Sequence, residues 1–268
     1  MFGAAEAYER YMARWSRRLA VMFLDFASFN DGDRLLDVGC GTGVLAMAAA
    51  DRMTRSEIVG VDPTETYVEF AQMRAQAPRV RFDVGDAQAL VYPDATFDRT
   101  LALLVLQFIP DMDLAIREMC RVTRPGGVVG GCVWDAEAAG QGLVHVFWDA
   151  VVALDPSAET RHVRNRDTSR RGKLADKFVA NGLGEVTETT LTVAMAFSGF
   201  DDFWLPHLEP AGPTGAYVAG LSPEHREALR SRLRRAVLGD LPEGPFTLHT
   251  PALAVRGQIP CRAPTWAA

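Results

Sequence analysis

The chain begins with one long amphipathic pattern and then alternates short apolar runs with helical ones. Apolar side chains recur at three- and four-residue spacing through residues 6–29, which predicts a helix whose opposite face is basic. From residue 33 onward, the pattern predicts helices between strands that cover residues 34–38, 57–61, 80–84, 97–106 and 128–134. The helices are expected over residues 44–53, 64–76 and 113–122. Such repeats indicate a doubly wound parallel sheet with right-handed crossovers.

After Trp134 this alternation stops. The pattern then predicts helices over residues 144–154 and 174–181, a strand over 185–194, more helices over 200–238 and a last strand over 246–255. We therefore expect an N-terminal helical lid (1–30), a core (31–135), a variable segment (136–183), a core strand (184–198), a helical cap insertion (199–243), a last core strand (244–258) and a tail (259–268).

Charge and composition disfavour several classes of protein. The formal net charge is −6, so the whole chain offers no electrostatic footprint for nucleic acid or an anionic membrane. The longest apolar run, residues 101–106, is far shorter than the roughly 18 residues that span a bilayer. The four cysteines show no metal-ligand spacing, and the N-terminus lacks the pattern of a signal peptide. We expect a cytoplasmic monomer or homodimer without a metal, a nucleic-acid partner or membrane insertion.

The segment Leu35–Gly43 (LLDVGCGTG) is the most informative part of the chain. An apolar strand runs into Gly39, Gly41 and Gly43, and a helix begins directly after them. This arrangement is typical of a nucleotide-sized site at the carboxyl edge of a parallel sheet. A dinucleotide fingerprint needs a third glycine where this chain has Val44, so an NAD-dependent oxidoreductase is disfavoured but stays an alternative. A phosphate loop is excluded because no G-K-[ST] follows.

Three aspartates lie at the ends of neighbouring predicted strands. Asp62 lies about 20 residues beyond the glycines, where a carboxylate accepts from both ribose hydroxyls, or it caps the next helix. Asp86 follows the third strand, where it accepts from an adenine amino group while the next N–H donates to a ring nitrogen, or it is an ordinary turn residue. Asp98 starts the fourth strand and is interpreted as a structural brace.

In this order, the motifs resemble those of class I S-adenosylmethionine-dependent methyltransferases, in particular the small-molecule subgroup that includes the ubiquinone/menaquinone-biosynthesis C-methyltransferases. The segments that carry the resemblance are Leu35–Gly43, Gly60-Val61-Asp62, Gly85-Asp86-Ala87, Phe97-Asp98 and residues 118–127. The resemblance implies an α/β, Rossmann-like methyltransferase fold with a doubly wound, mostly parallel seven-stranded sheet and helical cap insertions. It also implies an enzyme that moves the methyl group of S-adenosylmethionine to a small-molecule acceptor and releases S-adenosylhomocysteine.

The resemblance also implies the residues that bind the cofactor. Asp37, Gly39 and Gly41 would contact the methionine moiety, and the backbone near Leu103 would face its ammonium group. The remaining positions contact the ribose and the adenine, and they are Asp62, Pro63, Asp86 and Ala87. One departure concerns Gln107, which stands where relatives often have a histidine. A general base at this position is therefore not expected.

Methyl transfer from a sulfonium to an O, N or C atom is an in-line displacement that depends mainly on alignment and on the exclusion of water. A base is needed only for an acceptor that arrives protonated, so no catalytic residue is assigned. His145 and His207 are the acid–base candidates by region. Aromatic side chains either line an acceptor pocket or form the core beneath a cap: Tyr11, Trp15, Trp134 and Trp204, with Phe147, Trp148 and Phe203.

Two questions stay open from the sequence. The basic stretch Arg161 to Lys173 is interpreted as a solvated loop, with recognition of an anionic acceptor as the alternative. The fold is also compatible with a protein that binds S-adenosylmethionine without transferring the methyl group.

Overall fold

A computed structural model gives the structure of the chain and describes residues 6, 9–138, 142–161, 167–209 and 212–261. The side chains of residues 10 and 11 also lie outside the described part. The predicted acceptor residue Tyr11 therefore has a described backbone only. Within the basic stretch, residues 162–166 are outside the description, and the flanking residues form two short 3₁₀ turns, Pro156–Arg161 and Asp167–Ser169.

The core is a seven-stranded sheet with the order β3-β2-β1-β4-β5-β7-β6. Its parallel part contains β1 (Arg34–Val38), β2 (Glu57–Asp62), β3 (Val80–Val84), β4 (Phe97–Leu103) and β5 (Thr123–Trp134). The last two strands, β6 (Gly184–Phe197) and β7 (Phe246–Gln258), pair antiparallel to each other, and β7 pairs antiparallel to β5. The doubly wound, mostly parallel sheet expected from the sequence is confirmed.

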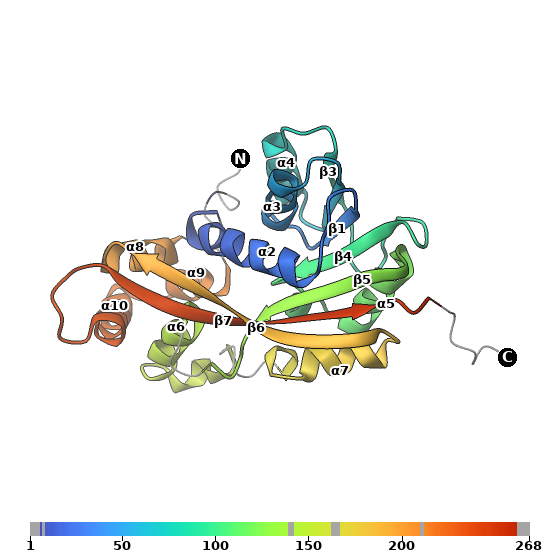
Figure 1. Ribbon diagram of the computed structural model, residues 1–268. Helices are drawn as coiled ribbons and strands as arrows, with labels where there is room; N and C mark the ends of the chain where they lie inside the picture. Colours follow the sequence, from blue (N-terminus) through green and yellow to red (C-terminus); the bar gives the residue numbers. More distant parts are fainter. Residues whose placement is uncertain (1–5, 7–8, 139–141, 162–166, 210–211, 262–268) are drawn as a thin grey trace.

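Helices cover both faces of this sheet (Figure 1). One face packs against α2 (Arg14–Phe26), α3 (Val44–Arg52) and α4 (Glu65–Arg74), and the other packs against α5 (Met112–Val122) and α7 (Lys173–Ala180). The strands β1 and β2 are buried along almost their whole length because their apolar side chains lie under helices on both sides. Helix α5 begins where Asp111 accepts a hydrogen bond from the N–H of Leu114, at 2.9 Å.

The antiparallel strands extend past the rest of the sheet. The pairing of β5 with β7 ends at Trp134, but β6 and β7 remain paired as far as Phe197 and Phe246. Because β5 ends there, this two-stranded ribbon projects beyond the carboxyl edge of the parallel strands. Figure 1 shows it leading to a group of cap helices. They are α6 (Leu143–Val152), α8 (Phe200–Trp204), η6 (Leu205–Leu208), α9 (Gly212–Ala219) and α10 (Pro223–Leu238).

The structure corrects three predicted elements. The strand predicted over residues 97–106 ends at Leu103, because Leu104 adopts a left-handed conformation (φ 61°) and the chain turns into η2 (Leu106–Phe108). The strand predicted over residues 128–134 begins earlier, at Thr123, where it already pairs with β4, and residues 124–127 form an irregularity inside it. The N-terminal helix is divided into a π-helical turn, η1 (Glu9–Ala13), and α2.

No helix among the described residues is long and apolar enough to cross a membrane.

Candidate functional site

The glycine segment forms a tight loop at the carboxyl end of β1. The carbonyl oxygen of Val61 at the end of β2 accepts hydrogen bonds from the N–H groups of Gly39 (2.8 Å) and Cys40 (3.0 Å). Gly39, Gly41 and Gly43 have φ angles of 68°, 52° and 84°, in the left-handed region that glycine adopts readily. The loop therefore folds back over the sheet edge before α3 begins.

The three glycines differ in what surrounds them. A side chain at Gly39 would collide with Val105, and one at Gly43 would meet Phe82 at 2.8 Å. At Gly41, by contrast, no atom of the described residues lies within 4 Å of the position that a Cβ would take. Gly39 and Gly43 are thus needed for packing within the protein, whereas Gly41 presents bare backbone to open space. Only Gly41 allows a ligand to approach the loop this closely.

A cavity lies against this loop. Its walls come from α2, β1, the glycine loop, the start of α3 and the end of β4, and they comprise Ser16, Asp37, Gly39, Cys40, Gly41, Thr42, Val44, Leu45, Leu103 and Leu104. Four predicted cofactor residues, Asp37, Gly39, Gly41 and Leu103, are thereby brought together. Leu104, whose strained backbone ends β4, lies beside them.

Asp37 is almost completely buried in the wall of the cavity, with 1% of its surface exposed. One carboxylate oxygen accepts a hydrogen bond from the N–H of Ala46 in the first turn of α3, at 3.0 Å. Burial raises the pKa of Asp37 to about 7, against the effect of this hydrogen bond, and the nearby Asp62 carboxylate adds to the rise. A cationic ligand group in the cavity would favour the ionised carboxylate.

Asp62 connects the end of β2 to the glycine loop. One carboxylate oxygen accepts from the N–H of Gly41 at 3.0 Å, and the other accepts from the N–H of Thr64 at 2.9 Å. Thr64 is the N-cap of α4, so Asp62 supports the start of this helix, as the alternative interpretation holds. The bond to Gly41 shows a further role, because it fixes the loop residue that faces open space. Each carboxylate oxygen keeps a second lone pair for a ligand hydroxyl.

Asp86 and Ala87 lie after the end of β3, outside the wall of this cavity. Asp86 is exposed and accepts from the N–H of Gln88 at 2.8 Å, which is a typical turn interaction. Ala87 is buried, with 9% of its surface exposed. The predicted adenine contacts therefore remain predictions. Pro63 directly follows Asp62 and precedes α4.

Three of the predicted acceptor residues lie in the hydrophobic core rather than on an open surface, and the side chain of the fourth, Tyr11, is outside the described part of the chain. Trp15, Trp134 and Trp204 have 3%, 8% and 3% of their surfaces exposed and belong to one hydrophobic cluster. The ring of Trp15 lies 5.2 Å from that of Phe197 on β6, and the ring of Trp204 is stacked on Phe200. The same cluster contains Phe147, Trp148 and Phe203. This burial is what the core interpretation predicts.

The two histidine candidates are also buried. The Nε2 atom of His145 lies 2.8 Å from the carbonyl oxygen of Asp135, to which it donates. Burial lowers the pKa of His207 to about 3, so its ring is neutral at neutral pH. Its ring is stacked on that of Phe147 at 4.6 Å. His207 is therefore part of the cap core.

The sequence interpretation missed two residues of this edge. Ser16 on α2 lines the cavity although only 3% of its surface is exposed. Its position between the buried residues Met12 and Leu19, on the apolar stripe of the helix, is the signal that could have revealed it. Glu9 in η1 contacts the loop from outside, accepting a hydrogen bond from Thr42 Oγ1 at 2.6 Å. Nothing in the local sequence indicates this contact.

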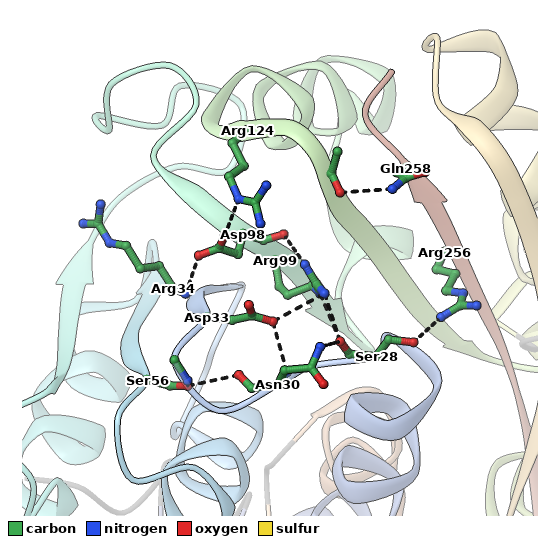
Figure 2. A network of polar contacts seen from close by, with 12 residues as sticks. Ser28, Asn30, Asp33, Arg34, Ser56, Asp98, Arg99, Arg124, Arg256 and Gln258 are labelled. Atoms are coloured by element: carbon green, nitrogen blue, oxygen red, sulfur yellow. Dashed lines mark hydrogen bonds and ion pairs between the residues drawn. The ribbon is translucent and has the colours of Figure 1, made fainter. Parts of the chain in front are cut away.

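The opposite edge of the sheet carries a different polar network (Figure 2). Asp98 accepts from the backbone N–H of Arg34 at 2.7 Å and from the guanidinium of Arg124. Burial alone would raise the pKa of Asp98, but these two hydrogen bonds lower it on balance. The interpretation of Asp98 as a structural brace is confirmed. Beside it, Arg99 donates to the carbonyl oxygen of Ser28 at 3.0 Å.

Among the described residues, no group of three or more His, Cys, Asp or Glu side chains is placed to bind a metal ion. All four cysteines are free thiols: Cys40 and Cys132 are buried, Cys120 is half-buried and Cys261 is exposed.

Comparison with known proteins agrees with this geometry. Residues 36–130 match a family model described as a methyltransferase domain. Over 224 residues, the chain is 34% identical to 27-O-demethylrifamycin SV methyltransferase of Amycolatopsis mediterranei. This match covers 76% of this chain and 75% of that protein. It is 35% identical over 116 residues to demethylmenaquinone methyltransferase of Thermus thermophilus, covering 42% of this chain and 51% of that protein.

Solved structures share the fold. Phosphoethanolamine N-methyltransferase 2 of Haemonchus contortus, in complex with S-adenosyl-L-methionine, superimposes with a TM-score of 0.58 at 19% identity. The superposition covers 96% of this chain and 57% of that chain.

Proposed function

The chain belongs to the class I S-adenosylmethionine-dependent methyltransferases, and from this membership we propose that the carboxyl-edge cavity binds the methyl donor. We assign donor binding to Asp37, Gly39, Gly41, Asp62, Pro63, Asp86, Ala87 and Leu103. The observation that carries this assignment is the open space at Gly41, whose N–H is held by Asp62. Membership in this family overturns the alternative of an NAD-dependent oxidoreductase.

The parts of the donor fit the chemistry of the successive strand ends. A carboxylate with spare lone pairs at Asp62 suits the two ribose hydroxyls. The exposed carboxylate of Asp86 suits the adenine amino group, and the adjacent Ala87 supplies an N–H. The buried carboxylate of Asp37 and the backbone near Leu103 suit the ammonium group of the methionine end.

The donor carries its own activation, because the methyl group is bound to a positively charged sulfur. The protein residues then have to hold the acceptor atom in line with that methyl group and exclude water. We propose that residues 1–30 act as a lid over the cavity and that residues 199–243 form a cap on the acceptor side. We assign neither His207 nor His145 as a general base, because both rings are buried and burial lowers the pKa of His207 to about 3. We assign no catalytic residue.

For the acceptor, we propose a hydroxyl group on an apolar small molecule. One relative that matches three quarters of the chain is named as a methyltransferase of 27-O-demethylrifamycin SV. The cap also presents an aromatic interior rather than a charged one. Trp15 and Trp134, which flank the cavity wall and the end of β5, would border the acceptor. Trp204 and Tyr11 would contribute from the cap and from η1.

We further propose that methyl transfer needs no metal and takes place in the cytoplasm, which suits four free cysteines. We expect a monomer or a homodimer, with no nucleic-acid partner.

The experiment that tests this function combines binding and turnover. Calorimetry should show binding of S-adenosylhomocysteine and no binding of NAD. Incubation with deuterium-labelled S-adenosylmethionine and a panel of hydroxylated polyketides, phenols and quinols should give a labelled methyl group on one class, seen by mass spectrometry. Donor binding without turnover on any acceptor would instead favour a protein that binds the donor without transferring the methyl group. Labelling of carbon or nitrogen would contradict the O-methylation proposal.

A further inference from the structure

Ser16 is a buried polar residue in the wall of the donor cavity that lacks a hydrogen-bond partner. It lies on α2, and only 3% of its surface is exposed. Its Oγ atom is fully buried and has no hydrogen-bond partner among the described residues. Leaving a buried hydroxyl unsatisfied costs about 1–3 kcal/mol, so such groups in folded proteins need a reason. Because Ser16 lines the cavity, a ligand there is the direct candidate for its partner.

The amino-acid end of the methyl donor carries an ammonium and a carboxylate. Asp37 offers the cavity a carboxylate for the ammonium, but none of the described residues that line the cavity is an arginine or lysine that could receive the donor carboxylate. Most loop N–H groups are already engaged: those of Gly39 and Cys40 with Val61, that of Gly41 with Asp62, and that of Gly43 with Cys40. The hydroxyl of Thr42 is bound to Glu9. The carboxylate of S-adenosylmethionine therefore needs another group that donates a hydrogen bond to it.

The start of α3 lies on the same cavity. Its first two residues, Val44 and Leu45, line the wall, and the helix is nine residues long. The first N–H groups of a helix have no partner within the helix, and the helix dipole favours an anion there. Of this first turn, the N–H of Ala46 is taken by Asp37. A carboxylate beside Val44 and Leu45 would thus find a favourable field and would face Ser16.

We propose that Ser16 Oγ, together with the N-terminus of α3, binds the α-carboxylate of the methyl donor. This inference rests on the proposed donor site and extends it to the N-terminal lid. Within the described part of the chain, the carboxylate is then recognised by one hydroxyl and a helix terminus rather than by a cationic side chain. Since Ser16 belongs to α2, donor binding also holds this helix against the glycine loop.

The test measures the affinity of Ser16→Ala for two ligands. S-adenosylhomocysteine carries the amino-acid end, whereas 5′-methylthioadenosine lacks it. Loss of a hydrogen bond to a charged group should raise the Kd for S-adenosylhomocysteine about 10- to 100-fold. The Kd for 5′-methylthioadenosine should stay within about threefold of the wild-type value. Ser16→Thr keeps the hydroxyl and should retain most of the affinity for S-adenosylhomocysteine.

The melting temperature of the ligand-free protein provides a second readout. If Ser16 had a purely structural role, replacing it would lower this temperature. Because Ser16→Ala removes an unsatisfied buried hydroxyl, the melting temperature of the ligand-free protein should stay equal or rise. The matched control is Ser169→Ala, since Ser169 Oγ is likewise buried and unpartnered among the described residues but does not line the cavity. This control should leave both affinities unchanged.

Two results with the Ser16→Ala protein would overturn the inference while leaving the donor site intact. One is a Ser16→Ala protein that binds S-adenosylhomocysteine as tightly as the wild type does. The other is an equal loss of affinity for both ligands, which would mean that Ser16 only shapes the cavity. If the wild-type protein binds 5′-methylthioadenosine but gains nothing from the amino-acid end, the carboxylate subsite is also wrong. If it binds neither ligand, the proposed donor site itself fails.

Discussion

The two edges of the central sheet use buried polar groups in opposite ways. At the amino edge, Arg99 donates to the carbonyl oxygens of Ser28 and Asp98 and forms an ion pair with Asp33 at 3.4 Å. Arg256 on β7 donates to Ser28 Oγ at 2.6 Å and to the carbonyl oxygen of Phe26 at 2.7 Å, which ties the end of α2 to the sheet (Figure 2). These groups find their partners within the protein.

At the carboxyl edge, several polar groups are left incomplete. Ser16 Oγ and the side-chain amide oxygen Oε1 of Gln107 are buried without a hydrogen-bond partner among the described residues. Asp37 is buried with a raised pKa, and Leu104 holds a strained backbone. A satisfied network contributes to stability, whereas an incomplete one carries a cost that only a ligand removes. The difference indicates which edge is built for folding and which for binding.

Of all the variants, Gly41→Asn is expected to cause the largest loss of ligand affinity at the carboxyl edge. Asparagine tolerates the left-handed conformation of this position, and no atom of the described residues lies within 4 Å of the position of its Cβ. The protein should therefore fold with little loss of stability, while the new side chain fills the cavity. We expect the Kd for S-adenosylhomocysteine to rise by about 100-fold or more, a loss of about 3 kcal/mol. Titration calorimetry measures this change.

Gly182→Asn is the matched control for that variant. Gly182 follows α7, has a φ of 86° and likewise has no described atom within 4 Å of its Cβ position. It lies outside the cavity wall, so its substitution should leave the affinity unchanged. Unaltered binding by Gly41→Asn would show that the open space at this loop is not where the donor lies.

A pair of aspartates sharpens the contrast between the edges. Asp62→Ala should weaken donor binding by roughly 1–3 kcal/mol, because a charge-assisted hydrogen bond to the ribose is lost. Asp98→Ala should reduce the free energy of unfolding by roughly 1–3 kcal/mol, because it leaves the N–H of Arg34 without its partner. Urea denaturation and calorimetry on both variants measure the two quantities.

The comparison requires that Asp98→Ala leave the donor Kd unchanged. Asp62→Ala should also lose a little stability, since it releases the N–H of Gly41. If both variants lost donor affinity equally, the two edges would not be functionally separate.

The raised pKa of Asp37 should make the stability of the folded protein depend on pH. Its pKa is about 7 in the folded protein and near 3.8 when the chain is unfolded. Between these values the folded protein keeps a proton that the unfolded chain has released, so stability should fall as pH rises from about 4 to 7 and then level off. Asp37→Asn should remove this slope, which thermal melts across the pH range would show.

Donor binding should depend on pH in the opposite sense. The positive charges of the donor favour ionised Asp37, so binding below pH 7 should expel a proton. The affinity should rise by up to about tenfold per pH unit as pH approaches 7, and change little above it. Calorimetry in buffers of different ionisation enthalpy detects the released proton. A pH-independent affinity between pH 5.5 and about 7 would mean that Asp37 stays in one protonation state.

The sequence was informative wherever the chemistry is local. The strands around Leu35–Gly43 and the position of Asp62 follow from periodicity and from spacing along the chain. The role of Asp98 as a brace was also predictable, because an aspartate at the start of a buried strand has few other uses. The end of β4 was not, because Leu104 to Leu106 remain buried or half-buried after the strand has turned away.

What the sequence could not show depends on contacts between distant segments. Ser16 reaches the glycine loop only because α2 packs across α3, and no local pattern specifies that packing. The aromatic residues of the cap illustrate the same limit. Their spacing is equally compatible with a pocket and with a core, and the structure buries Trp15, Trp134 and Trp204.

The smallest predicted effect concerns the contact that attaches η1 to the carboxyl edge. Glu9 is bound to Thr42 and forms ion pairs with Arg17 (2.5 Å) and Arg74 (2.9 Å). Partly exposed ion pairs contribute about 1 kcal/mol or less, so Glu9→Gln should raise the donor Kd by no more than about fivefold. Deuterium exchange should become faster in α2 of the ligand-free protein and return toward the wild-type rate when S-adenosylhomocysteine binds.

Glu57→Gln is the control, because Glu57 forms an ion pair with Arg34 at 3.0 Å at the amino edge. It should change neither the exchange of α2 nor the donor Kd. If residues 1–30 act as a lid that opens and closes, Glu9→Gln should change mainly the rates of donor association and dissociation. The ratio of these rates, and so the Kd, should change only a little. A loss of affinity as large as that of Asp62→Ala would instead place Glu9 in the binding site, and η1 would then belong to the fixed part of the carboxyl edge.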